Sequence, residues 1–185
     1  MKILFQSLKI TIALSVFLFV GYVLVLWGFG SIVEPNHGEA EVSTQKGKIV
    51  GATHVGQGFQ KTTYFWSRPS AVAYHGDGSG GSNKGATNPH YLTEVKKRIN
   101  AFLLAHPYLK RAQVPSEMVT ASGSGLDPHL SPEAVAVQVK RVAMARGISE
   151  QTVAKIVAAN TERPLLGKTV INVLQLNLAL DEIKN

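Results

Sequence analysis

Hydrophobic residues form one long uninterrupted block near the N-terminus. Residues 10–33 read ITIALSVFLFVGYVLVLWGFGSIV, and the only ionisable side chain among them is Tyr22, which is neutral at pH 7. A helix of about 24 residues is roughly 36 Å long, which exceeds the hydrocarbon core of about 30 Å in a bilayer. This block predicts a transmembrane helix. It is too long for the apolar region of a cleaved signal peptide, which usually runs about 7 to 15 residues.

The charged residues that flank this block differ in sign. Lys2 and Lys9 precede it, whereas Glu34, Glu39 and Glu41 follow it. Positive flanks are retained in the cytoplasm, so the N-terminus is predicted inside and the rest of the chain outside. The expected order along the chain is a cytoplasmic N-terminus (1–9), a transmembrane helix (10–33), a linker (34–48) and an extracytoplasmic domain (49–185).

Three segments of the domain combine apolar residues at helical spacing with start and stop signals. They begin at Asn88-Pro89, Ser131-Pro132 and Ser149, and they end at His106-Pro107, Gly147 and Arg163-Pro164 respectively. The C-terminal stretch 170–183 fits both a strand and a helix, because its leucines alternate while other apolar residues recur at helical spacing. We favour a helix there, because Asn172 is a good N-cap.

The remaining patterns predict short strands and long loops. Residues 51–59 indicate a strand or irregular hairpin, residues 118–121 a short strand, and the segment before Pro69 an extended chain. Residues 75–89 include five glycines and residues 122–127 form a second glycine and serine loop. Long loops in compact domains are often functional. The fold class is therefore predicted as α+β, mainly helical with a few short strands.

Composition removes several classes of function. The chain has no cysteine, which excludes disulfides, thiol nucleophiles and cysteine-based zinc sites. The net charge is +7, but two of the 19 basic residues precede the apolar block, so 17 basic residues oppose 12 acidic ones in the rest. No aromatic residues interleave with the basic ones, and no nucleic-acid module is visible. Nucleic acid is therefore not an expected partner.

Candidate catalytic motifs are weak. Residues 76–81, GDGSGG, resemble the nucleophile segment of chymotrypsin-like proteases with one glycine inserted before Ser79. Such catalysis needs closely set base, carboxylate and oxyanion donors on an all-β scaffold, which this chain does not predict. Gly167-Lys168-Thr169 looks like the end of a phosphate-binding loop, but Glu162 stands where the first glycine is needed, so a turn between helices is expected. The six histidines show no metal-ligand spacing on a predicted helix.

Several stretches together resemble the C subunit of the Kdp-type potassium-transporting P-type ATPase, the KdpC family. In this sequence they are GQGF (56–59), YFWSRPSA (64–71), SGGSN (79–83), VTASGSGLDPHLSP (119–132), RVAMARG (141–147) and VINVLQLNLALD (170–181). Their order and position behind one N-terminal apolar block make the set specific.

The resemblance implies a non-catalytic subunit of a high-affinity potassium pump. Its partners would be a channel-like potassium subunit, a P-type subunit phosphorylated by ATP, and a very small membrane peptide. The family is usually assigned a catalytic chaperone role that raises the ATP affinity of the hydrolysing subunit. The predicted topology keeps this domain away from cytoplasmic nucleotide, so such an effect would be transmitted through the membrane subunits. No cofactor is expected on this chain, since ATP and potassium are handled by its partners.

Two other classes stay open from the sequence: an anchored extracytoplasmic hydrolase and an unrelated anchored binding protein. Under the subunit interpretation, the outer domain is expected to dock on the channel-like subunit through its polar loops. The candidate contact residues are Gln57, Arg68, Ser79, Gly80, Gly81, Ser82, Asn83 and Asp127. No catalytic, cofactor-binding or metal-ligating residue is assigned.

Overall fold

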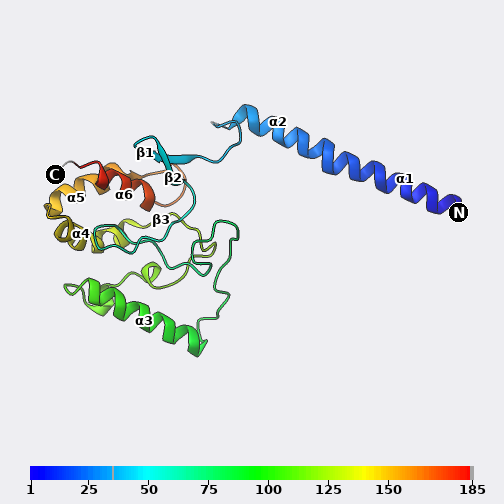
Figure 1. Cartoon of the computed structure of the whole chain (residues 1–185). Helices are drawn as coiled ribbons and strands as arrows, with labels where there is room; N and C mark the ends of the chain where they lie inside the picture. Colours follow the sequence, from blue (N-terminus) through cyan, green and yellow to red (C-terminus); the bar gives the residue numbers. More distant parts are fainter. Residues whose placement is uncertain (35, 184–185) are drawn as a thin grey trace. The chain divides into compact units, whose positions relative to one another are not determined.

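The computed structural model describes residues 1–34 and 36–183, and it divides the chain into two compact units. The first unit runs from Met1 to Glu41, and the second begins at Val42. Figure 1 shows a long helix in the first unit and a mixture of helices and short strands in the second. The predicted α+β class is confirmed.

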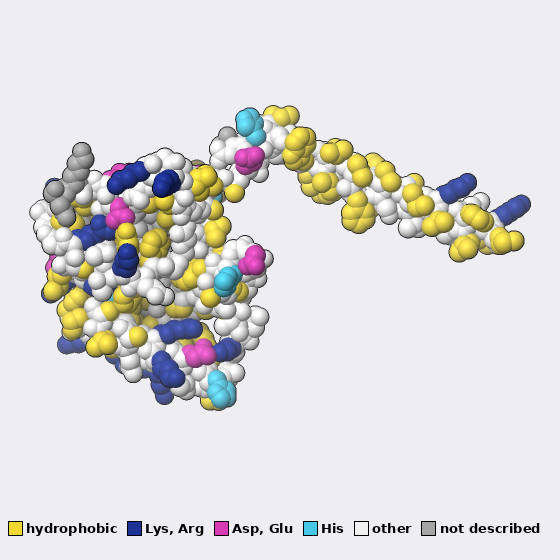
Figure 2. Space-filling model, in the orientation of Figure 1, with side chains coloured by type: hydrophobic (Ala, Val, Ile, Leu, Met, Phe, Trp, Pro, Cys, Tyr) yellow, Lys and Arg dark blue, Asp and Glu magenta, His cyan; other side chains and the backbone are white. Residues whose placement is uncertain are grey.

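The first unit is one continuous helix that begins earlier than the apolar block. It comprises α1 (Lys2–Val16), a π-helical stretch η1 (Phe17–Tyr22) and α2 (Val23–Val33). The span of 32 residues has a mean hydropathy of 2.5 and is long and apolar enough to cross a membrane. Its α-helical stretches contain no buried residue, and Figure 2 shows the surface of this unit as mostly hydrophobic, with basic side chains toward the N-terminus.

The second unit starts with a hairpin that begins within the segment predicted as a linker and ends at Ala52, so the strand or hairpin predicted at 51–59 is wrong beyond Ala52. Strands β1 (Val42–Gln45) and β2 (Lys48–Ala52) pair antiparallel with a bulge between Ser43 and Thr44. The Ser43 hydroxyl lies 3.0 Å from the Thr53 hydroxyl and accepts a 2.7 Å hydrogen bond from Gln175. Polar side chains that look like a linker in sequence therefore fix the hairpin to the C-terminal helix.

Capping residues set the starts of the domain helices as the sequence predicts. Asn88, Ser131, Ser149 and Asn172 each accept a hydrogen bond from a backbone N–H in the first turn. Gly147 ends one helix with a φ of 67°, a left-handed conformation that favours glycine. The helices are α3 (Pro89–Ala105), α4 (Pro132–Arg146), α5 (Glu150–Ala159) and α6 (Val173–Asp181). The helix predicted to end at Arg163-Pro164 instead stops at Ala159, and Thr161–Glu162 form a strand. The preference for a helix at the C-terminus is confirmed.

The domain also contains a small antiparallel sheet. Its strand order is β3-β5-β4, and the strands are β3 (His129–Leu130), β5 (Val170–Asn172) and β4 (Thr161–Glu162). The strand predicted at 118–121 is wrong, because the chain there forms the 3-10 turn η3 (Ser116–Met118). The carbonyl of Ser116 accepts bonds from both the backbone and the side chain of Thr120, which curls the segment back on itself. A second 3-10 turn, η2 (Arg111–Gln113), precedes it.

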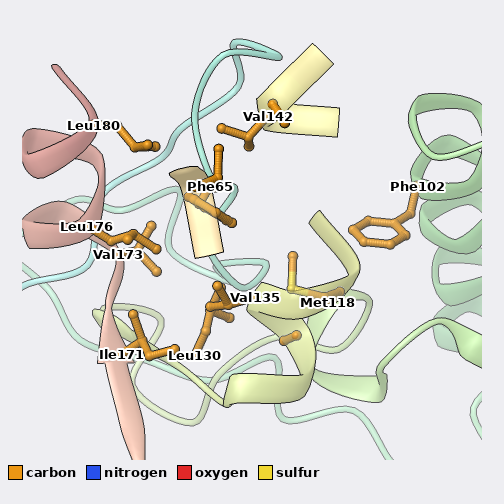
Figure 3. Packing of buried hydrophobic residues seen from close by; sticks show 13 residues of the cluster. Phe65, Phe102, Met118, Leu130, Val135, Val142, Ile171, Val173, Leu176 and Leu180 are labelled. Atoms are coloured by element: carbon orange, nitrogen blue, oxygen red, sulfur yellow. The ribbon is translucent and has the colours of Figure 1, made fainter. Parts of the chain in front are cut away.

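The hydrophobic core lies between α4, α6 and the extended segment 64–68. Figure 3 shows the core side chains gathered around Phe65, which is completely buried. Helix α3 contributes only one buried residue, Phe102, so its predicted amphipathic face is only partly covered. Among the described residues, the hydrophobic ones with 0% exposure are Phe65, Ala134, Val135, Val142, Val153, Ile171, Leu176 and Leu180.

Candidate partner-contact site

Two side-chain amides hold the extended segment 64–68. Asn177 of α6 accepts from the Phe65 N–H at 2.8 Å and donates to the Phe65 carbonyl at 3.0 Å. Gln138 of α4 does the same for Trp66, at 2.8 Å and 3.3 Å. Buried backbone groups must be paired, and here two amides replace a neighbouring strand. The clamp fixes the segment from which Arg68 and the following loop depart.

A buried arginine completes this clamp. Arg141 is 5% exposed, and its guanidinium donates to Gln138 Oε1 at 2.8 Å, to the Tyr64 carbonyl at 3.0 Å and to the Thr62 carbonyl. Its Nε donates to Nε2 of His106 at 2.9 Å. All of these acceptors are neutral. The guanidinium carbon also lies 4.4 Å from the centre of the Trp66 ring, a cation–π distance. Burial lowers the pKa of Arg141 to about 10.

His106 is the neutral acceptor that this arrangement requires. It is completely buried, it stacks on Phe102 with ring centroids 4.0 Å apart, and its Nδ1 lies 2.7 Å from the Phe102 carbonyl. Burial, and secondarily the charge of Arg141, lower the pKa of His106 to about 4. The histidine is therefore neutral at pH 7. Sequence reasoning treated His106 only as a helix stop and gave Gln138 and Arg141 no role, because their partners are distant in the chain.

An ion pair joins the end of the clamped segment to the glycine and serine loop at 122–127. Arg68 Nη1 lies 2.8 Å from Asp127 Oδ2, and Asp127 Oδ1 accepts a 3.0 Å bond from the His129 N–H. The side chains of the pair are 24% and 28% exposed. The Nε of Arg68 is buried and has no hydrogen-bond partner among the described residues. Tyr74 donates its hydroxyl proton to the Arg68 carbonyl, and burial raises the pKa of Tyr74.

Backbone contacts then bring the loops into one structure, which we call the loop cluster (residues 56–57, 67–83 and 122–127). Gly80 N–H and the Ser79 hydroxyl both donate to the Ser124 carbonyl, at 2.8 and 3.1 Å. A Cβ atom on Gly56 would lie 2.6 Å from the Asp127 carbonyl oxygen, and one on Gly125 would lie 2.7 Å from that of Gly80. These glycines are required because backbones approach each other closely.

The structure brings most of the predicted contact residues together. Arg68 pairs with Asp127, Ser79 and Gly80 bind the second loop, and Gly81 approaches the Gly123 carbonyl. The remaining residues are Gln57, whose carbonyl accepts a 2.7 Å bond from Ser67, the half-buried Ser82 and the exposed Asn83, which has a φ of 52°. Several of these groups therefore bond to other groups of the domain. Such residues hold the loops in place, whereas the exposed residues are available to contact a partner.

The weak catalytic motifs gain no support from this geometry. The Ser79 hydroxyl donates to a backbone carbonyl rather than to a base. Lys168 and Thr169 lie in the loop between strands β4 and β5, so the predicted turn between helices is corrected to a hairpin loop. A phosphate-binding loop instead leads into a helix. Over residues 1–34 and 36–183, no group of three potential metal ligands was found.

Sequence comparisons extend over both units. Residues 4–182 match the model of a protein family described as KdpC: K+-transporting ATPase, c chain. The potassium-transporting ATPase KdpC subunit of Bacteroides thetaiotaomicron is 56% identical over 189 residues, covering 100% of both chains. That of Flavobacterium psychrophilum is 50% identical with the same coverage. That of Caldanaerobacter subterraneus is 41% identical, covering 97% of this chain and 95% of the relative.

Proposed function

The chain belongs to the KdpC family of K+-transporting ATPase c chains, and from this premise we propose that it is a non-catalytic subunit that assembles and stabilises an ATP-driven potassium pump. The observation that carries the proposal is the match over residues 4–182, which includes the apolar helix and the folded domain. The partners are a channel-like subunit that selects potassium, a P-type subunit that hydrolyses ATP, and a very small membrane peptide.

The two units would contribute differently to assembly. Helices in lipid associate through close packing at small residues and a few polar contacts, rather than through hydrophobicity. The apolar helix has few small residues in its first half. The domain, in contrast, presents the loop cluster with its exposed Ser79 and Asn83. We therefore place the main recognition surface on the domain, docked against the channel-like subunit through the 79–83 side of the loop cluster.

The topology that underlies this proposal is N-terminus inside and domain outside, in the bacterial inner membrane. It follows from Lys2 and Lys9 before the apolar block and the acidic residues after it. In that orientation the domain does not reach cytoplasmic nucleotide. A catalytic chaperone effect on ATP affinity would then arise through conformational coupling across the membrane subunits, with ATP and potassium bound only by the partners.

Copurification of pump subunits tests the assembly role. The full chain should copurify with the channel-like and P-type subunits and restore growth at limiting potassium, whereas a chain that ends after Glu34 should do neither. The Asn83→Trp change places a large side chain at the proposed contact and should weaken copurification, while Gln151→Trp on the exposed face of α5 should not. Full retention of the complex by the N-terminal helix alone would contradict docking through the domain.

Cysteine labelling tests the topology, since the natural chain has no cysteine. The exposed Lys48, at the start of β2, is a suitable labelling position on the domain. A cysteine at Lys48 should react with a membrane-impermeant maleimide in intact spheroplasts, and one at Ser7 should react only after permeabilisation. The reverse pattern would place the domain in the cytoplasm.

A further inference from the structure

The loop between β4 and β5 exposes two leucines to solvent. Leu165 and Leu166 are 99% and 88% exposed, although both are large aliphatic residues. They occupy the end of the hairpin formed by Thr161–Glu162 and Val170–Asn172. A contiguous exposed apolar patch on a folded domain is typical of a protein or membrane interaction site. We call residues 163–169 the leucine loop.

The charges around these leucines indicate what covers them. Arg163 precedes the pair and Lys168 follows it, both exposed, and the leucine loop contains no acidic residue. Two acidic residues lie outside the loop: Glu162 immediately precedes it in strand β4, and Glu133 is in the first turn of α4. Arginine and lysine place their aliphatic stems beside apolar groups and their charged heads in a polar layer. Apolar side chains between two cations match the interface of a bilayer that contains anionic lipids.

An apolar groove continues this surface. A groove of about 890 Å³ lies between α4 and α5. Its lining includes the apolar residues Ala136, Val139 and Val157 and the charged residues Glu133, Arg163 and Lys168. The leucine loop borders this groove, because Arg163, Lys168 and Thr169 belong to both. The hairpin backbone still needs hydrogen-bond partners, so the leucine loop can enter only the interfacial layer, where water and headgroups remain.

The chain itself keeps the domain near a membrane. Only residues 34–41 connect the helix that ends at Val33 to the strand that begins at Val42. Eight residues extend at most about 29 Å. Because the domain is tethered within this distance of the bilayer, its surface has a high effective concentration there. Weak contacts between the leucine loop and lipid are then enough for binding.

We propose that the leucine loop is a second membrane contact of this chain, in which Leu165 and Leu166 insert into the interfacial layer while Arg163 and Lys168 bind anionic lipid headgroups. The proposal rests on the apolar helix being embedded in the membrane, and it is independent of docking to the pump subunits. In this position the loop would restrict the tilt of the domain relative to the bilayer.

A single fluorophore on the full chain tests the proposal. The Leu166→Cys variant, labelled with an environment-sensitive dye, is reconstituted in nanodiscs of phosphatidylcholine, with or without phosphatidylglycerol. Its emission should shift to the blue and should be quenched by a nitroxide placed near the lipid headgroups. The matched control is Leu104→Cys, since Leu104 is 85% exposed but lies at the end of α3. The control should keep the emission of a dye in water.

Charge variants distinguish headgroup binding by the two basic residues from insertion of the two leucines. In the Arg163→Gln, Lys168→Gln background, the extra blue shift caused by phosphatidylglycerol should be lost, while the shift in phosphatidylcholine alone should be retained. Equal signals from positions 166 and 104 would overturn the proposal. So would a shift at position 166 that appears only when the channel-like and P-type subunits are added, because that result would identify a protein surface as the occupant.

Discussion

The extended segment 64–68 and the leucine loop (163–169) contrast in how their groups are used. Phe65 is completely buried and its backbone is paired by Asn177, whereas Leu165 is almost fully exposed. The side chain and backbone of Phe65 make contacts that stabilise the folded domain. The leucine side chains of the second segment instead remain exposed to solvent. The comparison shows that a motif that identifies the family need not form the contact surface, because part of it is needed to hold the domain together.

The largest expected effect comes from removing one amide of the clamp. Gln138→Leu keeps the approximate size of the side chain but leaves the Trp66 N–H and carbonyl, and one Arg141 donor, without partners. Buried unpaired groups cost about 1 to 3 kcal/mol each, so we expect a loss of about 4 kcal/mol of unfolding free energy. Urea titration of the full chain in micelles, followed by Trp66 fluorescence in a Trp27→Phe background, measures this. The matched Gln151→Leu change on the exposed face of α5 should alter stability little, and equal effects would contradict the clamp.

A slightly smaller effect should follow from lowering the pH. His106 has a pKa of about 4 in the folded chain and 6.5 as its ordinary value. Between these values the unfolded chain binds more protons, so stability falls as the pH decreases from 6.5 to 4, by up to about 3 kcal/mol. His106→Gln keeps a possible acceptor for Arg141 without titrating, and it should flatten this part of the pH profile. An unchanged slope in that variant would assign the effect to other groups.

The ion pair between the loops should contribute less. Arg68→Asp and Asp127→Arg should each destabilise the domain by about 2 kcal/mol, because each leaves a partly buried charge beside a like charge. The double exchange restores opposite charges and should recover at least half of the loss, as measured by the same titration. Copurification of the double variant with the pump subunits then shows whether Arg68 only shapes the loops. A double variant as unstable as the sum of the single variants would contradict the pairing.

The smallest effect is expected at the leucine loop. The Leu165→Ser, Leu166→Ser double variant should change the free energy of unfolding by no more than about 0.5 kcal/mol, because exposed side chains add little to folding. Thermal and urea unfolding in micelles of a neutral detergent measure this. A loss comparable to that of Gln138→Leu would show that the leucines pack within the folded domain, and would remove the contrast between the two regions.

The sequence by itself determined the features that depend on neighbouring residues. The apolar block, the helix caps at Asn88, Ser131, Ser149 and Asn172, and the glycine stop at Gly147 all follow from interactions within a few positions of the chain. The family could also be identified from the sequence, because the order and spacing of its motifs are properties of the sequence alone. The sequence did not predict that the apolar face of α3 would be only partly covered. Residue spacing predicts such a face but not which distant segments pack against it.

Only the tertiary structure decided which polar groups pair and which apolar groups stay exposed. Gln138 meets Trp66 across 72 positions, Asn177 meets Phe65 across 112, and Arg68 meets Asp127 across 59. Long-range pairs leave no periodic signal, so the prediction that Ser43 belongs to a linker could not be corrected from the sequence. Exposure of Leu165 and Leu166 is likewise a property of the whole fold, because a leucine is buried or exposed according to what distant segments bring beside it.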